Sequence, residues 1–326
     1  MRLALAVDGG NSKTDVALVR EDGAVLGAIR GPASSPHHLG VEAALDVIGG
    51  LIAELAPAEP PTAALLLLAG VDFPDEEHAV ETMAVERNWA SRMRVSNDTF
   101  AVLRAGTDAG WGVGIVCGAG MNCVGVARDG REARFPALGP ITGDWGGGAD
   151  LGMEALYSAA RSEDGRGPRT LLEARVPAHF GFVAPSEVAH AIHRGQLSER
   201  RLLELAPLVL ELAADDPVAA AIVARLVSEI VAFVRVAAGR LRLEEEVFDV
   251  VLGGGLLQHA EPQVVAAIAQ GVHLTAPGAV VRPTAAPAIV GSALLVLDEL
   301  GVDAEAKTRV RQELESETVT IGGRDG

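Results

Sequence analysis

The chain opens with short apolar segments that alternate with turns rich in glycine. Residues 2–7, 15–19 and 24–29 each predict a short strand, and Asp22-Gly23 between the last two is a tight-hairpin signal. The stretch 8–14 separates the first strand from the second. The chain therefore begins with an antiparallel meander. This excludes the P-loop and the dinucleotide fingerprint, because both need a helix directly after the glycines.

Helix and strand patterns alternate over the next residues. Apolar residues at helical spacing predict a helix over 41–55, and the apolar run 63–69 is short enough for a buried parallel strand. A helix over 75–89, a strand over 93–97 and a further helix from Thr99 complete this part. The order predicts an α/β unit with a mixed sheet.

A similar pattern restarts after Gly106. It predicts, in order, strands over 112–117 and 122–128, mostly helix over 149–242, strands over 247–252 and near Val280, and a helix over 289–300. The tail after Val302 is polar, and we expect it to fray. Two such patterns indicate a structural duplication with a cleft between the halves. At roughly 150 residues per domain, 326 residues fit two domains, which we expect at 1–107 and 108–326.

Composition narrows the function classes. The formal charge of −17 argues against nucleic acid and against anionic membranes as partners, because both recruit positive charge. Two cysteines exclude a disulfide scaffold or a four-Cys metal site within one chain. The longest apolar runs, such as 62–71, are about half of the ~20 residues that span a bilayer. The N-terminus carries no secretory signal, so we expect a cytoplasmic location.

The turn 8–14 is the first candidate for chemistry. Its glycines let backbone N–H groups face a phosphate, and Asp8 could hold Mg²⁺ through water. Ser12, Lys13 and Thr14 add further donors. The alternative is an ordinary hairpin whose glycines serve the turn alone.

Glycines recur at two later strand ends. Gly118-Ala119-Gly120 repeats the strand–turn–strand geometry in the second half, so two turns could grip a polyphosphate from both sides of a cleft. Gly253, Gly254 and Gly255 follow a strand and permit the close approach of a planar ligand such as adenine. The alternative for these three is a simple strand-to-helix turn.

Two acidic residues are the remaining candidates. Asp98 follows a parallel strand, where α/β sheets place their ligands, and it could accept a proton from a substrate hydroxyl. The alternative is an N-cap of the next helix. Asp144 lies in the Gly-rich stretch 139–148 and could bind the hydroxyls of a polar ligand, in a loop that its glycines allow to move. The alternative is a flexible surface loop.

Taken together, these motifs resemble the BadF/BadG/BcrA/BcrD ATPase-like family within the actin, sugar kinase and Hsp70 superfamily, and among its members most of all the N-acetylglucosamine kinases. The matching stretches, in order, are DGGNSKTDVALV (8–19), VSNDTFAVLRAG (95–106), GIVCGAGMNCVGV (114–126), LGPITGDWGGGADLG (138–152), LGGG (252–255) and VGSALL (290–295). The resemblance implies two ribonuclease H-like, actin-like ATPase domains of α/β class, with a cleft between them.

The resemblance also implies an activity: transfer of the γ-phosphoryl group of ATP, with Mg²⁺, to an amino sugar, which would give N-acetylglucosamine 6-phosphate. By position, Asp8 would bind the metal and Asp98 would be the catalytic base. The implied nucleotide-binding residues are Gly9, Gly10, Asn11, Ser12, Lys13, Thr14, Gly118, Ala119, Gly120, Gly253, Gly254 and Gly255. Sugar contacts would come from Asp98, Asn122, Leu138, Gly139 and Asp144. We expect a homodimer with a small-molecule sugar substrate and neither nucleic acid nor membrane as partner.

The sequence departs from the family pattern in places that bear on the sugar. Ala119 and Met121 replace a Thr and a Ser of the second phosphate motif, Leu138 replaces a Trp, and Trp145 replaces a Glu. The family pattern also has an Asn near the third strand that contacts the sugar, and this sequence has no clear counterpart in the region of His37 and His38. We interpret these two histidines as a surface pair. A kinase for glucosamine or for a muramic-type sugar therefore stays open.

A second alternative is the ATPase activator of 2-hydroxyacyl-CoA dehydratases, whose members bridge an iron–sulfur cluster with two cysteines per chain. Cys117 and Cys123 match that count, but both fall in predicted strands, which favours small core residues. A sugar sensor would need an additional DNA-binding module, and this chain has neither the length nor the positive charge for one. The zinc-bearing sugar kinases of the superfamily carry a Cys-rich motif that this sequence lacks.

Overall fold

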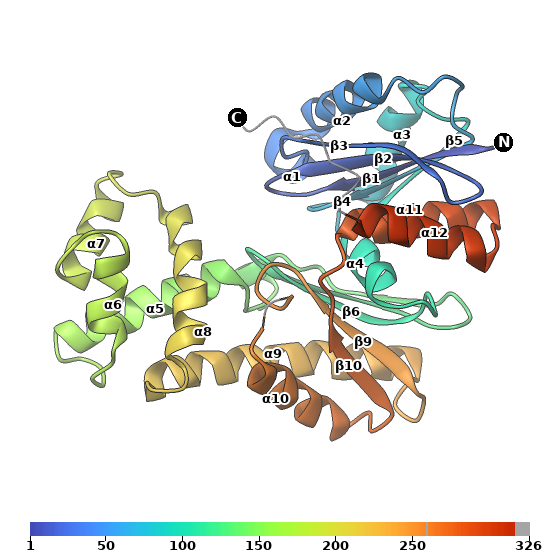
Figure 1. Cartoon of the computed structure of the whole chain (residues 1–326). Helices are drawn as coiled ribbons and strands as arrows, with labels where there is room; N and C mark the ends of the chain where they lie inside the picture. Colours follow the sequence, from blue (N-terminus) through green and yellow to red (C-terminus); the bar gives the residue numbers. More distant parts are fainter. Residues whose placement is uncertain (259, 317–326) are drawn as a thin grey trace. The chain divides into compact units, whose positions relative to one another are not determined.

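The computed structural model describes residues 1–258 and 260–316, which group into two compact units (Figure 1). Unit 1 comprises Met1–Gly114, Arg128–Gly130 and, among the described residues, 284–316. Unit 2 comprises Ile115–Ala127 and Arg131–Pro283. Each unit contains one five-stranded sheet, as the α/β class with two similar halves predicts.

The sheet of unit 1 has the strand order β3-β2-β1-β4-β5. The strands are β1 (Leu3–Gly9), β2 (Thr14–Arg20), β3 (Val25–Gly31), β4 (Ala63–Leu68) and β5 (Arg92–Asn97). Strands β1 to β3 form the predicted antiparallel meander, while β4 and β5 run parallel to β1. The mixed sheet is thus confirmed, and it carries the first candidate turn between β1 and β2.

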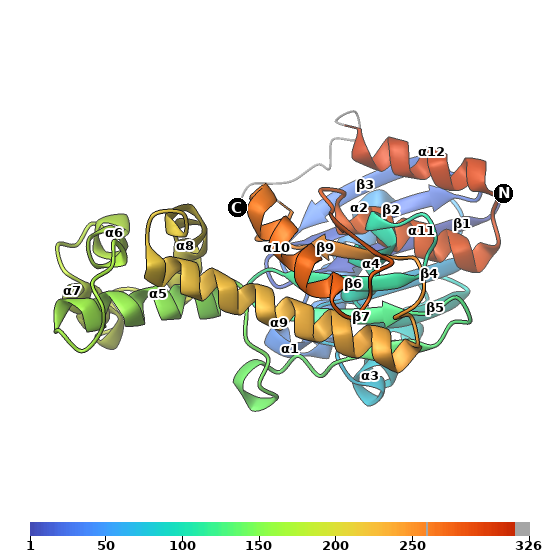
Figure 2. The same cartoon turned by 90° about the horizontal axis from the view of Figure 1, so that it is seen from below.

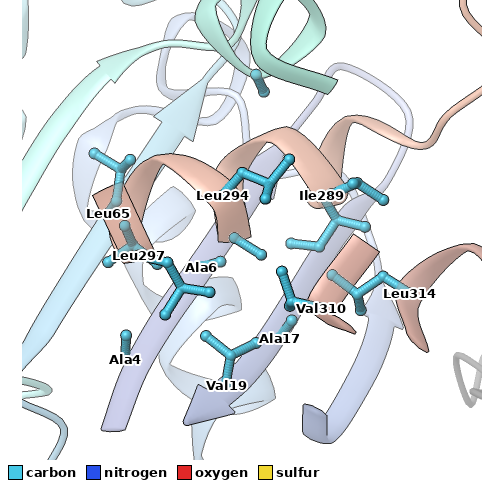
Figure 3. Close-up of a cluster of buried hydrophobic side chains, with 14 of the residues drawn as sticks. Ala4, Ala6, Ala17, Val19, Leu65, Ile289, Leu294, Leu297, Val310 and Leu314 are labelled. Carbon is cyan, nitrogen blue, oxygen red and sulfur yellow. The ribbon is translucent and has the colours of Figure 1, made fainter. Parts of the chain in front are cut away.

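Helices cover both faces of this sheet (Figure 1). They are α1 (Pro36–Leu39), α2 (Val41–Leu55), α3 (Pro74–Glu86), α4 (Thr99–Gly106), α11 (Ala288–Leu300) and α12 (Ala304–Glu315). One face packs against α2 and α3, with Leu45 and Ile48 fully buried. The other face packs against α11 and α12, as Figure 3 shows for Leu294 and Val310.

The end of the chain differs from our expectation. We expected the residues after Val302 to fray, but α12 occupies 304–315 and is capped by Asp303, whose side chain accepts a hydrogen bond from the Ala306 N–H. Val310 and Leu314 are buried against the sheet of unit 1 (Figure 3). Their apolar side chains are spaced like one face of a helix, which explains why this polar segment forms a helix. Residues 317–326 of the expected tail lie outside the described residues. For the same reason the contacts assign residues 284–316 to unit 1, whereas the expected ranges of 1–107 and 108–326 place them with the second half.

The sheet of unit 2 has the order β10-β9-β6-β7-β8. Its strands are β6 (Gly112–Cys117), β7 (Met121–Val126), β8 (Glu132–Arg134), β9 (Phe248–Gly253) and β10 (Ala279–Pro283). Two long helices, α9 (Pro217–Leu241) and α10 (Pro262–His273), pack against each other, and α9 also contacts β7 and β8. This sheet carries the second candidate turn, between β6 and β7, and the three glycines after β9.

A group of shorter helices lies at one end of α9 in unit 2 (Figure 2). Between β8 and α9 the elements are η1 (Gly139–Ile141), α5 (Gly148–Glu163), α6 (Leu172–His179), α7 (Pro185–His193), η2 (Glu199–Leu205) and α8 (Ala206–Leu212). The predicted helical region 149–242 is confirmed. Its first helix, α5, starts at Gly148, the last glycine of the stretch 146–148.

Within the described residues, α9 is the one helix that is long and apolar enough to cross a bilayer. Its buried side includes Leu226, Ile230 and Val234, while Arg225 and Arg235 lie on other sides of the same helix. This pattern, together with its contacts to β7, β8, α8 and α10, is that of a core helix in an α/β unit.

Candidate functional site

In unit 1 the turn after β1 is closed by backbone hydrogen bonds. The N–H of Gly10 donates to the carbonyl of Lys13 at 2.9 Å, and the exposed residues 11–13 form the tip. A Cβ at Gly9 would lie 2.5 Å from Leu68 Cδ2 and 2.6 Å from Ser34 Oγ, so a larger residue there would have to displace both buried side chains. The turn is therefore both tight and packed onto its own sheet, which fixes the backbone beside Asp8.

Thr14 differs from the other predicted donors of this turn. Its side chain is fully buried, and Oγ1 donates to the carbonyl of Pro32 at 2.6 Å and lies 2.7 Å from Ser34 Oγ. The hydroxyl thus joins β2 to the segment after β3. Among the side chains of the turn, Asn11, Ser12 and Lys13 are exposed hydrogen-bond donors of the kind that phosphate requires.

Charged side chains line up across three strands beside the turn. In the register of the sheet Asp8 lies opposite Asp15, which lies opposite Arg30. The buried Asp15 carboxylate accepts two hydrogen bonds from Arg30, at 2.6 and 2.9 Å, and lies 3.4 Å from Lys13 Nζ. Asp15 thereby holds two cations close to Asp8.

Asp8 is partly buried at the end of β1. Burial raises the pKa of its carboxyl to about 8, and the neighbouring carboxylates of Asp98 and Asp15 act in the same direction. Lys13 and Arg30 oppose this effect only in part. The site therefore favours a positive charge next to Asp8, either a proton or a metal cation.

Asp98 follows β5 and precedes α4. We considered a helix N-cap as the alternative role, but its side chain makes no capping hydrogen bond. Instead the N–H of Thr99 donates to Oδ1 of Asn97 at 2.9 Å. Asp98 is thus not used as a cap, which leaves its carboxylate for another role.

The environment of Asp98 moves its pKa toward neutrality. The pKa of Asp98 is raised to about 7, with burial as the largest cause, and the Asp72 carboxylate acts in the same direction. The backbone N–H groups of Asp98 and Thr99 act in the opposite direction. A carboxyl group that titrates near the working pH is suited to accept a proton.

In unit 2 the turn between β6 and β7 is held by the start of α5. The N–H of Gly148 donates to the carbonyl of Gly118 at 2.8 Å, and that of Ala149 donates to the carbonyl of Ala119 at 2.9 Å. The C=O and N–H of a trans peptide point in opposite directions. The N–H groups of Ala119 and Gly120 therefore point away from α5, side by side, as an anion site requires.

Two glycines allow other segments to press against this turn. At Gly147, with φ +86°, a Cβ would lie 2.5 Å from the backbone of Gly120. At Gly254, with φ +85°, it would lie 2.5 Å from the carbonyl oxygen of Cys117. The turn 118–120 is thus packed between the stretch before α5 and the turn after β9, whereas Gly118, Gly120 and Gly255 themselves face open space.

The predicted sugar-contacting residues Leu138, Gly139 and Asp144 lie in one compact turn. The Asp144 N–H donates to the Gly139 carbonyl at 3.0 Å, and the Thr142 hydroxyl donates to the Asp144 carboxylate. Asn122 is in β7, directly after the turn 118–121, and its Oδ1 accepts from the Cys123 N–H. The structure thus brings Leu138, Gly139 and Asp144 together.

The stretch 145–148 is packed in place by its neighbours. The Gly146 N–H donates to Asp150 at 2.8 Å, and a Cβ at Gly146 would lie 2.9 Å from Met121 Cε. The guanidinium of Arg225 lies 4.0 Å from the ring centroid of Trp145, a cation–π contact. The glycines that we interpreted as permitting movement serve close packing here.

Sequence reasoning missed several residues that shape the site. Asn97 and Asp72 flank the base candidate, Asp15 and Arg30 flank Asp8, and Gly147 supports the second turn. The signal for Asp15 was present, because a carboxylate inside an apolar strand needs a cationic partner when it is buried. His37 and His38 lie on α1, and both are exposed, as expected of a surface pair.

Both cysteines are buried in strands, as expected, Cys117 in β6 and Cys123 in β7. Burial raises the pKa of the Cys117 thiol to about 12, and it also raises the pKa of Cys123. Iron–sulfur clusters bind thiolates, so two buried thiols that resist deprotonation do not suit a cluster shared between subunits.

The residues of unit 1 suit a magnesium ion better than a metal held by protein ligands alone. Among the described residues, no group of three or more His, Cys, Asp or Glu side chains is arranged to hold a metal. Mg²⁺ usually binds through one or two carboxylates together with water and substrate phosphates. Asp8, a carboxylate with a neighbouring excess of negative charge, fits that requirement.

Comparison with known proteins agrees with this arrangement. Residues 5–296 match the BadF/BadG/BcrA/BcrD ATPase family. The chain belongs to this family. The predicted family and α/β fold are thereby confirmed.

The chain matches two curated relatives over most of their length. The chain is 28% identical over 215 residues to an N-acetylmuramic acid/N-acetylglucosamine kinase of Clostridium acetobutylicum, which covers 64% of this chain and 70% of the relative. It is 24% identical over 311 residues to an N-acetyl-D-glucosamine kinase of Dictyostelium discoideum, which covers 90% of this chain and 97% of the relative.

Solved structures show the same fold. A protein of Chromobacterium violaceum, provisionally described as an N-acetylglucosamine kinase, superposes with a TM-score of 0.68 at 24% identity, over 91% of this chain and 99% of that one. A ROK family glucokinase of Streptomyces griseus, solved with glucose and AMPPNP, gives a TM-score of 0.53 at 17% identity, over 91% and 99%. At these identities the likeness concerns the fold.

Proposed function

We propose that this protein is an ATP-dependent sugar kinase that phosphorylates an amino sugar, with N-acetylglucosamine as substrate and N-acetylglucosamine 6-phosphate as product. The family is one of ATPases, and both curated relatives are named as kinases of N-acetylated amino sugars. The observation that carries the proposal is Asp98: a partly exposed carboxylate at the end of a parallel strand, left free of capping by Asn97.

Asp98 is the proposed catalytic base. It would accept the proton of the sugar 6-hydroxyl as the oxygen attacks the γ-phosphorus, and ADP would leave with the electron pair of the broken bond. Phosphoryl transfer depends on positioning and electrostatic stabilisation more than on covalent chemistry. A base whose pKa is about 7 combines a useful ionised fraction with proton affinity at neutral pH.

The phosphate-binding roles fall to both turns. In unit 1 we assign phosphate binding to the backbone of Gly9, Gly10 and Asn11 and to the side chains of Ser12 and Lys13. The Thr14 hydroxyl has a structural role instead. In unit 2 we assign the N–H groups of Ala119 and Gly120, whose orientation α5 fixes, whereas the Gly118 N–H closes the turn by donating to the Gly120 carbonyl at 2.9 Å. Gly253, Gly254 and Gly255 would accommodate adenosine.

Asp8 would hold Mg²⁺, which when bound neutralises charge on the phosphates of ATP. The chain's own contribution is to keep a carboxylate at that position with Lys13 and Arg30 nearby. This fit rests on the donor set described above.

The sugar would contact Asp98, Asn122, Leu138, Gly139 and Asp144. The compact turn of 138–144 presents backbone groups and one carboxylate, which suits hydroxyl recognition. A muramic-type sugar is a second candidate substrate, because the Clostridium relative is named for both sugars and Leu138 is smaller than the Trp of the family pattern. Glucosamine is a third.

The test is an ADP-release assay with Mg²⁺-ATP and five sugars: N-acetylglucosamine, glucosamine, glucose, N-acetylmannosamine and N-acetylmuramic acid. Mass spectrometry and NMR of the product locate the phosphate. We expect the highest kcat/KM on N-acetylglucosamine, with phosphate at the 6-hydroxyl. ATP binding without turnover on any of the five would contradict the proposal, and a higher kcat/KM on N-acetylmuramic acid would reassign the substrate.

Three further expectations accompany the proposed function. A homodimer is expected from the resemblance, and light scattering of the purified protein tests it. A cytoplasmic location is the second, and fractionation of the source cells tests it. The third is the lack of a nucleic-acid or membrane partner, which follows from the acidic composition and which DNA-binding and vesicle-binding assays test.

A further inference from the structure

The segment before the base candidate contains a buried amide that joins two parts of unit 1. Asn97 is the last residue of β5 and is 6% exposed. Its Oδ1 accepts from the Thr99 N–H at 2.9 Å, and its Nδ2 donates to Asp72 Oδ1 at 2.8 Å and to the Val71 carbonyl at 3.2 Å. The amide is thus bonded on both sides, toward α4 and toward the loop before α3.

The loop that carries Asp72 is itself held in place. Glu76 accepts hydrogen bonds from the N–H groups of Asp72 and Phe73, at 2.9 and 3.1 Å. The first turn of α3 is also fixed to β5, because Glu77 accepts a hydrogen bond from the Ser96 hydroxyl at 2.6 Å. Asp72 therefore offers Asn97 a fixed partner.

The rest of α4 is fixed on its opposite side. Arg104 Nε donates to Asp298 of α11 at 2.8 Å, and a Cβ at Gly291 would lie 1.8 Å from the Ala101 carbonyl oxygen. The helix body thus lies in direct contact with α11. Ala101 belongs to the first turn of α4, so α11 also fixes the start of the helix, and the hydrogen bonds of residues 97 to 99 act on the segment just before it, where Asp98 lies.

We propose that Asn97 and Asp72 form a bridge that positions Asp98 for proton transfer, Asn97 by capping α4 in place of Asp98 and Asp72 by orienting the Asn97 amide. Asn97 and Asp72 are positioning residues, and neither needs to touch the sugar. This inference rests on the proposed function. A misplacement of the base by about 1 Å is enough to cost on the order of 10²-fold in rate.

A swap of the two side chains tests the bridge. In Asn97→Asp the Thr99 N–H keeps an acceptor, but two carboxylates oppose each other and the bridge is lost. In Asp72→Asn the bridge survives, because Asn97 Nδ2 still finds an amide oxygen. In the double variant Asn97→Asp/Asp72→Asn, the amide introduced at position 72 can donate to the carboxylate introduced at position 97, which restores the bridge at the wild-type net charge.

The matched control is Asn97→Asp/Asp75→Asn. Asp75 is exposed in the first turn of the same helix α3, so this variant also has the wild-type net charge but cannot restore the bridge. For each protein we would measure kcat, the KM for sugar and the KM for ATP, with circular dichroism to confirm folding.

We expect kcat to fall about 30-fold in Asn97→Asp, with both KM values changed less than threefold. The kcat of the swapped double variant should be at least tenfold higher than that of Asn97→Asp, and the kcat of the control double variant should equal that of Asn97→Asp. Equal recovery in both double variants, or none in either, would overturn the bridge. Should Asn97→Asp not fold, Asn97→Ser keeps an acceptor for Thr99 but no donor for Asp72, and an unchanged kcat in that variant would also overturn it. A wild-type protein without sugar kinase activity would instead contradict the proposed function, and with it the bridge's role.

Discussion

The two glycine turns share a strand–turn–strand plan but are built differently. The turn after β1 is surrounded by charge, with Asp8, Asp15, Lys13 and Arg30 interacting across the strands. The turn after β6 has no charged side chain among residues 118–121 and is shaped by backbone hydrogen bonds to α5. In the proposed kinase, the first turn recognises phosphate and cation through side-chain charge, and the second recognises phosphate through the orientation of its peptide N–H groups.

This difference predicts which substitutions each turn tolerates. The second turn should be sensitive to added volume, because glycine contacts hold it. The first should be sensitive to changes of charge at nearly constant volume.

Gly147→Ala should have the largest effect. The new Cβ would lie 2.5 Å from the backbone of Gly120, at a residue with φ +86°. Backbone strain and overpacking together should lower the free energy of unfolding by about 3 kcal/mol or more and abolish ATP binding. Urea unfolding and calorimetric titration with ATP measure both effects.

The control for this prediction is Gly143→Ala. Gly143 has φ +79°, but its Cβ would meet nothing within 4 Å. The loss in unfolding free energy should be only about 1 kcal/mol, from strain alone. Equal losses in the two variants would show that contact with Gly120 does not hold the turn.

Asp8→Asn should abolish turnover while it stabilises the metal-free protein at alkaline pH. The folded pKa of Asp8 is raised to about 8 from a normal value of 3.8, so the wild type loses unfolding free energy as the pH rises from about 4 through 8. Asn does not ionise and lacks this loss.

The excess stability of Asp8→Asn over the wild type should therefore grow between pH 5 and pH 8. Urea unfolding at both pH values in EDTA measures it, and Asp75→Asn, at an exposed position of α3, serves as the control. A gap that shrinks as the pH rises would contradict the account of Asp8.

Lys13→Met should raise the KM for ATP about tenfold, roughly 1.4 kcal/mol, with a smaller change in kcat. The ammonium group is half-exposed beside Asp15 and provides a point charge for phosphate. Steady-state kinetics at saturating sugar measure the change. Lys307, the only other lysine of the chain, pairs with Asp298 at 2.7 Å, and Lys307→Met should leave the KM for ATP unaltered.

Ala119→Thr should have the smallest effect. It restores a hydroxyl of the family pattern at an exposed position of the second turn, and we expect a solvent-screened hydrogen bond from this hydroxyl to phosphate to contribute about 0.5 kcal/mol, the low end of the usual range. ATP affinity should rise two- to threefold by about that amount. Ala119→Val has the same shape without the hydroxyl, so an equal gain there would contradict a hydrogen bond to phosphate.

Much of the fold could be predicted from the sequence. Short apolar runs bounded by glycine indicated nearly all the strands, and the family and α/β fold were confirmed. The prediction failed at α12, where Ala306, Val310 and Leu314 recur every four residues within a polar segment. This weakly amphipathic segment forms a helix because it packs on an apolar surface of unit 1. The residues of that surface are distant in sequence, so the polarity of the segment alone does not predict the helix.

The site was predictable where chemistry is local in sequence. The glycine turns and Asp98 stand in short motifs. The pairs Asp15–Arg30 and Asn97–Asp72 join residues 15 and 25 positions apart, so they depend on strand register and on the loop before α3. The role of Gly147 likewise depends on the turn against which it packs. The assignment of each site residue stays a prediction for these experiments.

The most direct test of the central claim compares sugar-dependent ADP formation by the wild type and Asp98→Asn, with ATP affinity measured separately by calorimetry. The account predicts that kcat falls about 10²- to 10⁴-fold in the variant, because the base is lost, while the Kd for ATP changes less than threefold. A variant that keeps nearly full turnover on N-acetylglucosamine would contradict the role of Asp98 as the base.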